Sequence, residues 1–137
     1  MCVTNVSLIY KPGVVVAVEY VAADGSLRWL GPHWTLRDAL EIARRVYLEA
    51  EQDLVVTEVF GGRHTEHSFH YIGRAADLRT NNLRADIRSA VLAKLGTDLK
   101  VLGYQVIFEG DHAHIEPFGA RADFPYSLAV IKDGRHG

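Results

Sequence analysis

Residues 63–80 read RHTEHSFHYIGRAADLRT, a polar segment that runs into a short apolar one. His70 and Asp77 stand seven residues apart in it, with Gly73 between them. This arrangement suits a loop that leads into a strand, because a glycine lets the backbone turn where other residues are strained. We predict a strand at residues 75–78 that carries Asp77.

A second stretch, residues 110–117 (GDHAHIEP), adds His114. Imidazole, carboxylate and imidazole form the ligand set of a catalytic zinc site, which has three protein ligands and leaves one position for water. We therefore predict His70, Asp77 and His114 as metal ligands, with one Zn²⁺ per chain as the cofactor.

The second stretch also supplies candidates for the catalytic base. Asp111 would accept a proton from the zinc-bound water and pass it to the leaving amine, provided that the chain bends at Gly110. His112 shares a strand face with His114, and is the alternative as base, as transition-state donor or as a fourth ligand. Glu116 lies on the same face and could hold the second nitrogen of His114.

Four further residues are candidates for contacts with a substrate or a ligand. Arg63 and Arg74 could bind a carboxylate or stabilise an oxyanion. A surface charge is an equal alternative for Arg63 and the simpler interpretation of Arg74. Ser68 could orient His70 through a hydrogen bond. Tyr71 could line the cleft, unless it belongs to the core or its rim. Glu109, like Glu66, is expected to be solvated.

The rest of the chain alternates strand patterns with two helical ones. A helix is expected from Thr35 to Ala50, and a second from Leu83 to Leu95, capped by Asn81 or Asn82 and stopped by Gly96. The apolar and β-branched runs predict strands at 3–10, 14–21, 27–30, 54–60, 75–78, 101–108, 112–116 and 127–131.

Short turns join the first two and the last two long strands, which favours antiparallel hairpins. We therefore predict an α+β fold with a central antiparallel sheet and two main helices, in one domain spanning residues 1–137.

Composition excludes several classes of protein. The 137 residues are 48% hydrophobic and 23% charged, with a formal net charge of −2, so no basic field argues for nucleic acid. The single cysteine, Cys2, cannot form an intramolecular disulfide. No apolar run reaches the roughly 18 residues of a membrane span, and we see no signal peptide. We expect a monomer that is cytoplasmic when made.

The two stretches resemble known motifs. Residues 68–77 (SFHYIGRAAD) resemble the S-x-H-x-x-G-x-A-x-D signature of the zinc D-alanyl-D-alanine carboxypeptidase and dipeptidase family, which includes phage endolysins that cut L-alanyl-D-glutamate bonds. Residues 111–116 (DHAHIE) are similar to the acid-x-x-His-x-Glu motif of that family. Residues 62–64 (GRH) are similar to phage members. The likeness covers roughly residues 54–118.

The resemblance implies zinc on His70, Asp77 and His114, with Asp111 as the general base. It also implies the fold that this family shares with lysostaphin-type peptidases and the amino-terminal domain of Hedgehog proteins. Many members carry a Ser-Gly-Tyr-Arg segment, where this chain has TEVF at residues 57–60, and its nearest arginine is Arg63.

The function implied by this resemblance is hydrolysis of a peptide bond in the peptidoglycan stem, as by a D-Ala-D-Ala carboxypeptidase or an L-Ala-D-Glu endopeptidase. The expected partners are peptidoglycan or its stem peptides, and delivery to the cell wall would rely on phage lysis machinery or a virion. Two alternatives remain at this point: a non-catalytic zinc-binding module, and a phage structural or adaptor protein with the same fold.

Overall fold

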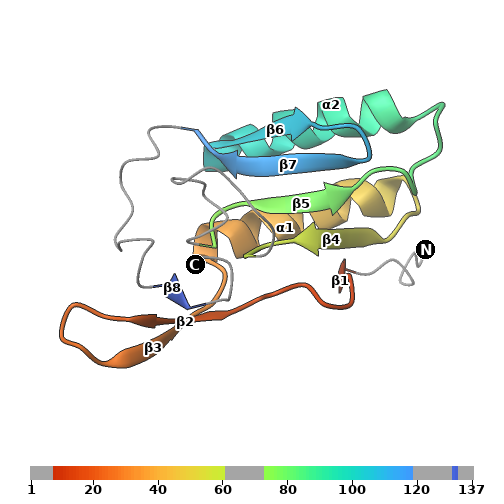
Figure 1. The fold of residues 1–137 in the computed structure, drawn as a ribbon. Coiled ribbons are helices and arrows are strands. Elements are labelled where there is room, and N and C mark those ends of the chain that lie inside the picture. Colours follow the sequence, from red (N-terminus) through yellow and green to blue (C-terminus); the bar gives the residue numbers. More distant parts are fainter. Residues whose placement is uncertain (1–7, 61–72, 119–130, 133–137) are drawn as a thin grey trace.

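The computed structural model describes residues 8–60, 73–118 and 131–132. They form an α+β fold with a five-stranded sheet, a three-stranded sheet and two α-helices (Figure 1). In chain order the elements are β1 (Leu8–Tyr10), β2 (Val18–Val21), β3 (Leu27–Leu30), α1 (Trp34–Glu49), β4 (Leu54–Glu58), β5 (Ala76–Arg79), α2 (Arg88–Leu99), a 3₁₀ turn η2 (Lys100–Leu102), β6 (Tyr104–Phe108), β7 (His112–Pro117) and β8 (Ile131–Lys132).

The larger sheet has the strand order β1-β4-β5-β7-β6. Three of its four strand pairings are antiparallel, and at one edge β1 runs parallel to β4. The sheet is therefore mixed, and the prediction of a wholly antiparallel central sheet is wrong at that edge. A parallel pair requires a long crossover, and the chain between β1 and β4 contains β2, β3 and α1.

The predicted hairpin between residues 3–10 and 14–21 is also wrong. β2 pairs instead with β3 and β8, which makes the smaller sheet. The turn between β2 and β3 explains this choice, because Asp24 accepts hydrogen bonds from both the backbone N–H and the hydroxyl of Ser26. Gly25 adopts a left-handed φ of 85° in the same turn, so the tight connection is formed locally.

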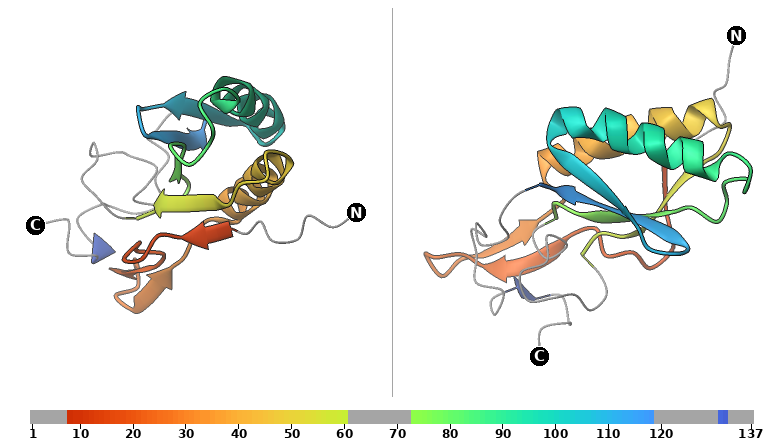
Figure 2. Two further views of the ribbon diagram at one scale, coloured as in Figure 1. Left: turned by 90° about the vertical axis from the view of Figure 1, so that its right-hand side faces the viewer. Right: turned by 90° about the horizontal axis from the view of Figure 1, so that it is seen from above.

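Both helices cover the same face of the larger sheet (Figure 2). Helix α1 begins one residue before the predicted start, and His33 caps it by accepting a hydrogen bond from the Thr35 N–H. Helix α2 starts later than predicted, and Ile87 precedes it without a side-chain cap. It continues through Gly96, and the chain turns only at Gly103, whose φ is 75°.

Side-chain alternation separates the two faces of the sheet. Ala76 and Leu78 of β5 are buried in the core beneath the helices, as is Ile115 of β7. Residues between them must point the other way. The face without helices therefore carries the polar side chains of both central strands, namely Asp77, Arg79, His112, His114 and Glu116.

None of the helices in the described parts of the chain has the length and apolar character needed to cross a membrane.

Candidate metal centre

Asp77 and His114 are direct cross-strand neighbours on the face without helices. In the β5–β7 ladder Asp77 pairs with His114, and Arg79 pairs with His112. The His114 Nδ1 atom lies 2.9 Å from Asp77 Oδ1, and both side chains are largely shielded from solvent. Two residues 37 positions apart in the chain, both predicted as ligands, are thus brought into contact.

His114 has a carboxylate at each ring nitrogen. Its Nε2 atom lies 2.6 Å from Glu116 Oε1, while Nδ1 faces Asp77. A neutral imidazole has only one N–H, so one of these contacts would set a lone pair against an oxygen. A second proton, on the imidazole or on one of the carboxyl groups, or a cation on Nδ1 resolves the conflict.

The two carboxylates make His114 easier to protonate. Burial by itself lowers the pKa of His114, but the hydrogen bonds to Asp77 and Glu116 outweigh it and raise the pKa above its ordinary value. A metal ion at Nδ1 would replace that second proton, because a ligating histidine is neutral.

Glu116 holds His114 from behind. Its side chain is only 3% exposed, and its Oε2 accepts a hydrogen bond of 3.1 Å from Gln105 on the neighbouring strand β6. A carboxylate on the remote nitrogen of a ligand histidine orients the ring and increases its basicity. This contact agrees with the role predicted for Glu116 from the strand pattern.

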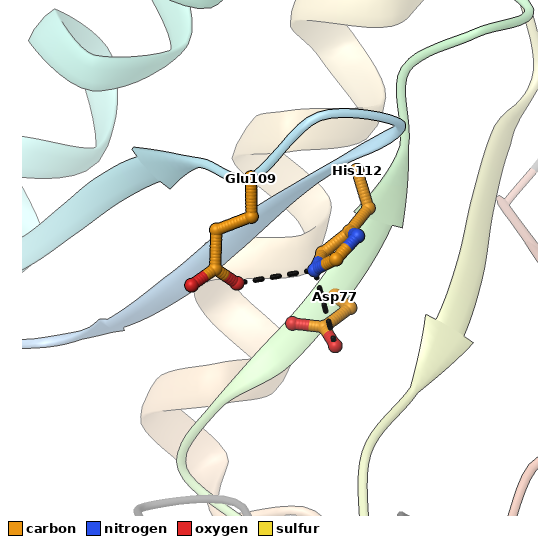
Figure 3. A group of neighbouring side chains, drawn as sticks. All are labelled: Asp77, Glu109 and His112. Carbon is orange, nitrogen blue, oxygen red and sulfur yellow. Dashed lines mark hydrogen bonds and ion pairs between the residues drawn. The ribbon is translucent and has the colours of Figure 1, made fainter.

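A second cluster of possible ligands lies beside the first. Figure 3 shows His112, from the start of β7, between Asp77 of β5 and Glu109 of the β6–β7 turn. His112 Nε2 lies 3.1 Å from Glu109 Oε1 and 3.8 Å from Asp77 Oδ2. One donor atom from each residue lies within 4.8 Å of the others, so the described residues contain a group able to hold a metal ion.

The donor set fits zinc. Two ligands of a tetrahedral zinc ion with bonds of 2.0–2.1 Å are about 3.3 Å apart. The Asp77–His114 contact at 2.9 Å and the Asp77–His112 contact at 3.8 Å lie on either side of this value. Small side-chain movements would therefore bring either histidine and Asp77 to zinc-binding distance.

Asp111 and His112 form a hydrogen-bonded pair. His112 Nδ1 lies 2.8 Å from Asp111 Oδ1, whose side chain is 77% exposed. That contact holds the pKa of Asp111 below its usual value. Partial burial lowers the pKa of His112, but Asp111, the charge of Asp77 and Glu109 together raise it above its ordinary value.

The loop before β5 shows why the sequence needs a glycine there. Gly73 has a φ of 69°, and a Cβ atom on it would lie 2.7 Å from Phe60 Cζ and 2.9 Å from the Gly31 carbonyl oxygen. Its own carbonyl accepts a hydrogen bond of 2.8 Å from the His33 N–H. The glycine thus lets the strand that carries Asp77 enter the sheet close against the core.

Arg74 follows this glycine, and its described contact is with the start of α1. Its Nη2 lies 3.3 Å from His33 Nε2, and its carbonyl accepts a hydrogen bond from the Tyr104 hydroxyl. Burial, followed by the charges of Arg74 and Arg37, lowers the pKa of His33. A substrate contact for Arg74 stays a prediction.

A polar cavity of about 480 Å³ opens beside the two clusters. The described residues that line it are Lys11, Thr57, Glu58, Asp77, Arg79, Asn81, Asp111 and His112. Asp77, Asp111 and His112, three of the site residues predicted from the sequence, therefore line one cavity.

Arg63, Ser68, His70 and Tyr71 lie outside the described residues. Within them, the sequence interpretation missed Glu109, which was expected to be solvated although it contacts His112. It also missed Lys11 and Arg79. Arg79 had a usable signal, since it stands two residues after Asp77 and so shares its strand face; Lys11 had none.

Comparisons with models of known protein families, with curated proteins and with solved structures found no significant match to this chain.

Proposed function

We propose that this protein is a zinc-dependent peptidase that hydrolyses a peptide bond in the stem peptide of peptidoglycan. The observation that carries the proposal is the pairing of Asp77 with His114, whose second nitrogen is held by the buried Glu116. The resemblance to the family motif suggests His70 as the third ligand. It also suggests peptidoglycan stem peptides as the substrate class. The fold proposed is the one shared by D-Ala-D-Ala peptidases and Hedgehog domains.

A zinc ion held there would polarise the scissile carbonyl and make water acidic enough to be deprotonated at neutral pH. Asp77 and His114 would hold the ion and fix its position beside the substrate. Asp111 accepts the proton of the attacking water and returns it to the leaving amine. His112, hydrogen-bonded to Asp111, is the alternative acceptor, and its contact with Asp111 makes the two act as a pair.

Digestion of purified peptidoglycan, followed by mass spectrometry of the released fragments, tests this proposal. We expect fragments from the zinc-loaded wild type and from Asp86→Ala, a matched control whose exposed carboxylate pairs with Arg84. We expect none from Asp111→Ala, although it binds zinc as the wild type does. The masses identify the bond that is cut. Intact peptidoglycan after treatment with zinc-loaded wild type would contradict the proposal.

A second candidate function, a non-catalytic zinc-binding module, is favoured by the position of His112. Its Nε2 lies near Asp77, so His112 could serve as a fourth protein ligand and close the site to water. In that case His112→Gln lowers zinc affinity, chelation unfolds the protein, and no fragments are released. For the peptidase, His112→Gln leaves zinc affinity within about twofold of the wild type and lowers turnover instead.

A further inference from the structure

The cavity beside the proposed metal centre has a cationic side that the reaction does not use. Lys11 and Arg79 line it together with Asp77, Asp111 and His112. Lys11 comes from the end of β1, where its backbone N–H donates a hydrogen bond of 2.9 Å to the Val56 carbonyl of β4. Because β4 lies between β1 and β5, the two cations reach the cavity from different strands.

Arg79 has a defined spacing from the metal centre. It follows Asp77 by two residues in β5 and pairs with His112 across the ladder. Two residues of a strand advance by about 6.6–6.8 Å. An extended peptide advances by about 3.3–3.6 Å per residue, so Arg79 lies about two substrate residues from a bond placed at Asp77.

The two cations lack acidic partners in the described parts of the chain, where the structure records no ion pair for either side chain. Three acids, Glu58, Asp77 and Asp111, also line the cavity. Of these, Asp111 is hydrogen-bonded to His112 and Asp77 to His114. Arginine and lysine that face a concave polar surface bind carboxylates through charge-assisted hydrogen bonds.

We propose that Lys11 and Arg79 form a carboxylate-binding subsite, and that the enzyme selects stem peptides with a free carboxylate within two residues of the scissile bond. This inference rests on the proposed function for its substrate. Stem peptides offer two such groups, the α-carboxylate of D-Glu and the carboxylate of the terminal D-Ala, and both can be replaced by an amide of nearly equal size.

The test uses four synthetic forms of one pentapeptide, L-Ala-γ-D-Glu-L-Lys-D-Ala-D-Ala, with each carboxylate either free or amidated. They are given to zinc-loaded wild type, Lys11→Met, Arg79→Met and Arg84→Met. Methionine keeps an apolar stem of similar length, and Arg84 is a matched control because it is exposed and paired with Asp86. The first readout is kcat/KM for cleavage of each peptide. The second is the Kd of each peptide, measured by titration calorimetry with the same substitutions in zinc-loaded Asp111→Ala, which should not cleave the peptide.

We expect amidation of one carboxylate to lower the kcat/KM of the wild type by about 10- to 100-fold, the range of a charged hydrogen bond. Arg79→Met should lose a similar factor on the free carboxylate and should no longer distinguish it from the amide. Lys11→Met should show a smaller loss of the same kind, and Arg84→Met should match the wild type.

Equal losses on free and amidated peptides in Arg79→Met, or no preference in the wild type, would overturn the subsite. Failure of the proposed function looks different. If no form is cleaved but the free carboxylate binds in an Arg79-dependent manner, the peptidase is wrong and the subsite stands. If the calorimeter detects no binding of any form, the subsite is wrong as well.

Discussion

His114 is the residue on which the proposed metal centre depends, because each of its ring nitrogens meets an acid of a different kind. Asp77 approaches Nδ1 from the next strand, and Glu116 approaches Nε2 from two residues along the same strand. We assign the ion to the first of these positions, since Glu116 is almost fully buried and already accepts a hydrogen bond from Gln105.

Replacing Glu116 by glutamine should therefore weaken zinc binding without removing a ligand. The amide keeps the size of the side chain but no longer draws charge from the imidazole, so we expect zinc affinity to fall by about 10- to 100-fold. Competition with a chromophoric chelator measures this affinity.

The matched control for Glu116→Gln is Glu109→Gln, which changes the glutamate that contacts the other histidine of β7, His112. We expect the affinity of this variant to stay within about twofold of the wild type. The opposite ranking, with Glu109→Gln losing zinc and Glu116→Gln retaining it, would place the ion on the cluster of Asp77, Glu109 and His112 instead.

At Gly73 the backbone conformation and the close contact with Phe60 both exclude a side chain. Gly73→Ala should lower the free energy of unfolding by about 1–3 kcal/mol, because the alanine must adopt a strained φ and displace the phenylalanine ring. Gly96→Ala is the control: this glycine lies in α2 with no atom near its absent Cβ, so alanine should stabilise by up to about 1 kcal/mol. Urea denaturation compares the two, and equal effects would refute the explanation.

Helix α1 carries a charge cluster on its solvent side. Glu41 accepts hydrogen bonds from Arg44 and Arg45, and the bond from Arg44 is the main reason that the pKa of Glu41 falls to about 2. A pKa that is lower in the folded state than in the unfolded state adds stability above the unfolded value, near 4.5, and loses it as the pH falls toward 2.

The pH dependence of α1 follows from this shift. Because Glu41 is well exposed, we expect Glu41→Gln to cost only about 0.5 kcal/mol at pH 7. The difference from the wild type should shrink between pH 4.5 and pH 2 and vanish below pH 2. Denaturation series at several pH values and low salt measure it, and a difference that persists at pH 2 would contradict this account.

Tyr47 joins α1 to the strand that carries the site. Its buried hydroxyl donates a hydrogen bond of 2.7 Å to the Arg79 carbonyl at the end of β5. Tyr47→Phe leaves that carbonyl without its donor, so we expect a loss of about 1–2 kcal/mol in the free energy of unfolding. Tyr10→Phe is the control, because its hydroxyl has no hydrogen bond to the described residues. Comparable losses in both would show that Tyr47 acts through packing alone.

On the scale of the whole molecule, the core and the candidate metal centre occupy opposite faces of one sheet. The core lies under α1 and α2 and is built from apolar side chains such as Leu40, Leu78 and Leu95. A metal ion bound at the candidate site would add binding energy to this fold, but the apolar layer contains none of the candidate ligands.

Removal of zinc by a chelator should therefore abolish activity and leave the protein folded at 25 °C. With free zinc near 1,000 times its Kd, binding adds about 4 kcal/mol of stability, so we expect Tm to fall by roughly 10–15 °C. Far-UV circular dichroism at 25 °C should stay unchanged. Collapse of the signal on chelation would favour the structural zinc module.

Local patterns in the sequence predicted the types of most elements and singled out Asp77, Asp111, His112, His114 and Glu116, but not Glu109, Lys11 or Arg79. Alternating residues identified β7 and the turn before it, and the spacing around Gly73 predicted the strand of Asp77. These patterns failed where the start of a helix depends on distant contacts. Asn82 donates a hydrogen bond to the Asp53 carbonyl and does not cap α2, which begins at Arg88.

What the sequence determined by itself is the chemistry available: which residues could bind a metal, and which strand face each of them occupies. The tertiary structure alone decided which of them meet. The register of β5 on β7 sets Asp77 against His114, and the parallel pairing of β1 with β4 carries Lys11 to the cavity. The physical reason is that periodicity records only which side of a strand is buried, whereas partner and register depend on contacts between segments far apart in the chain.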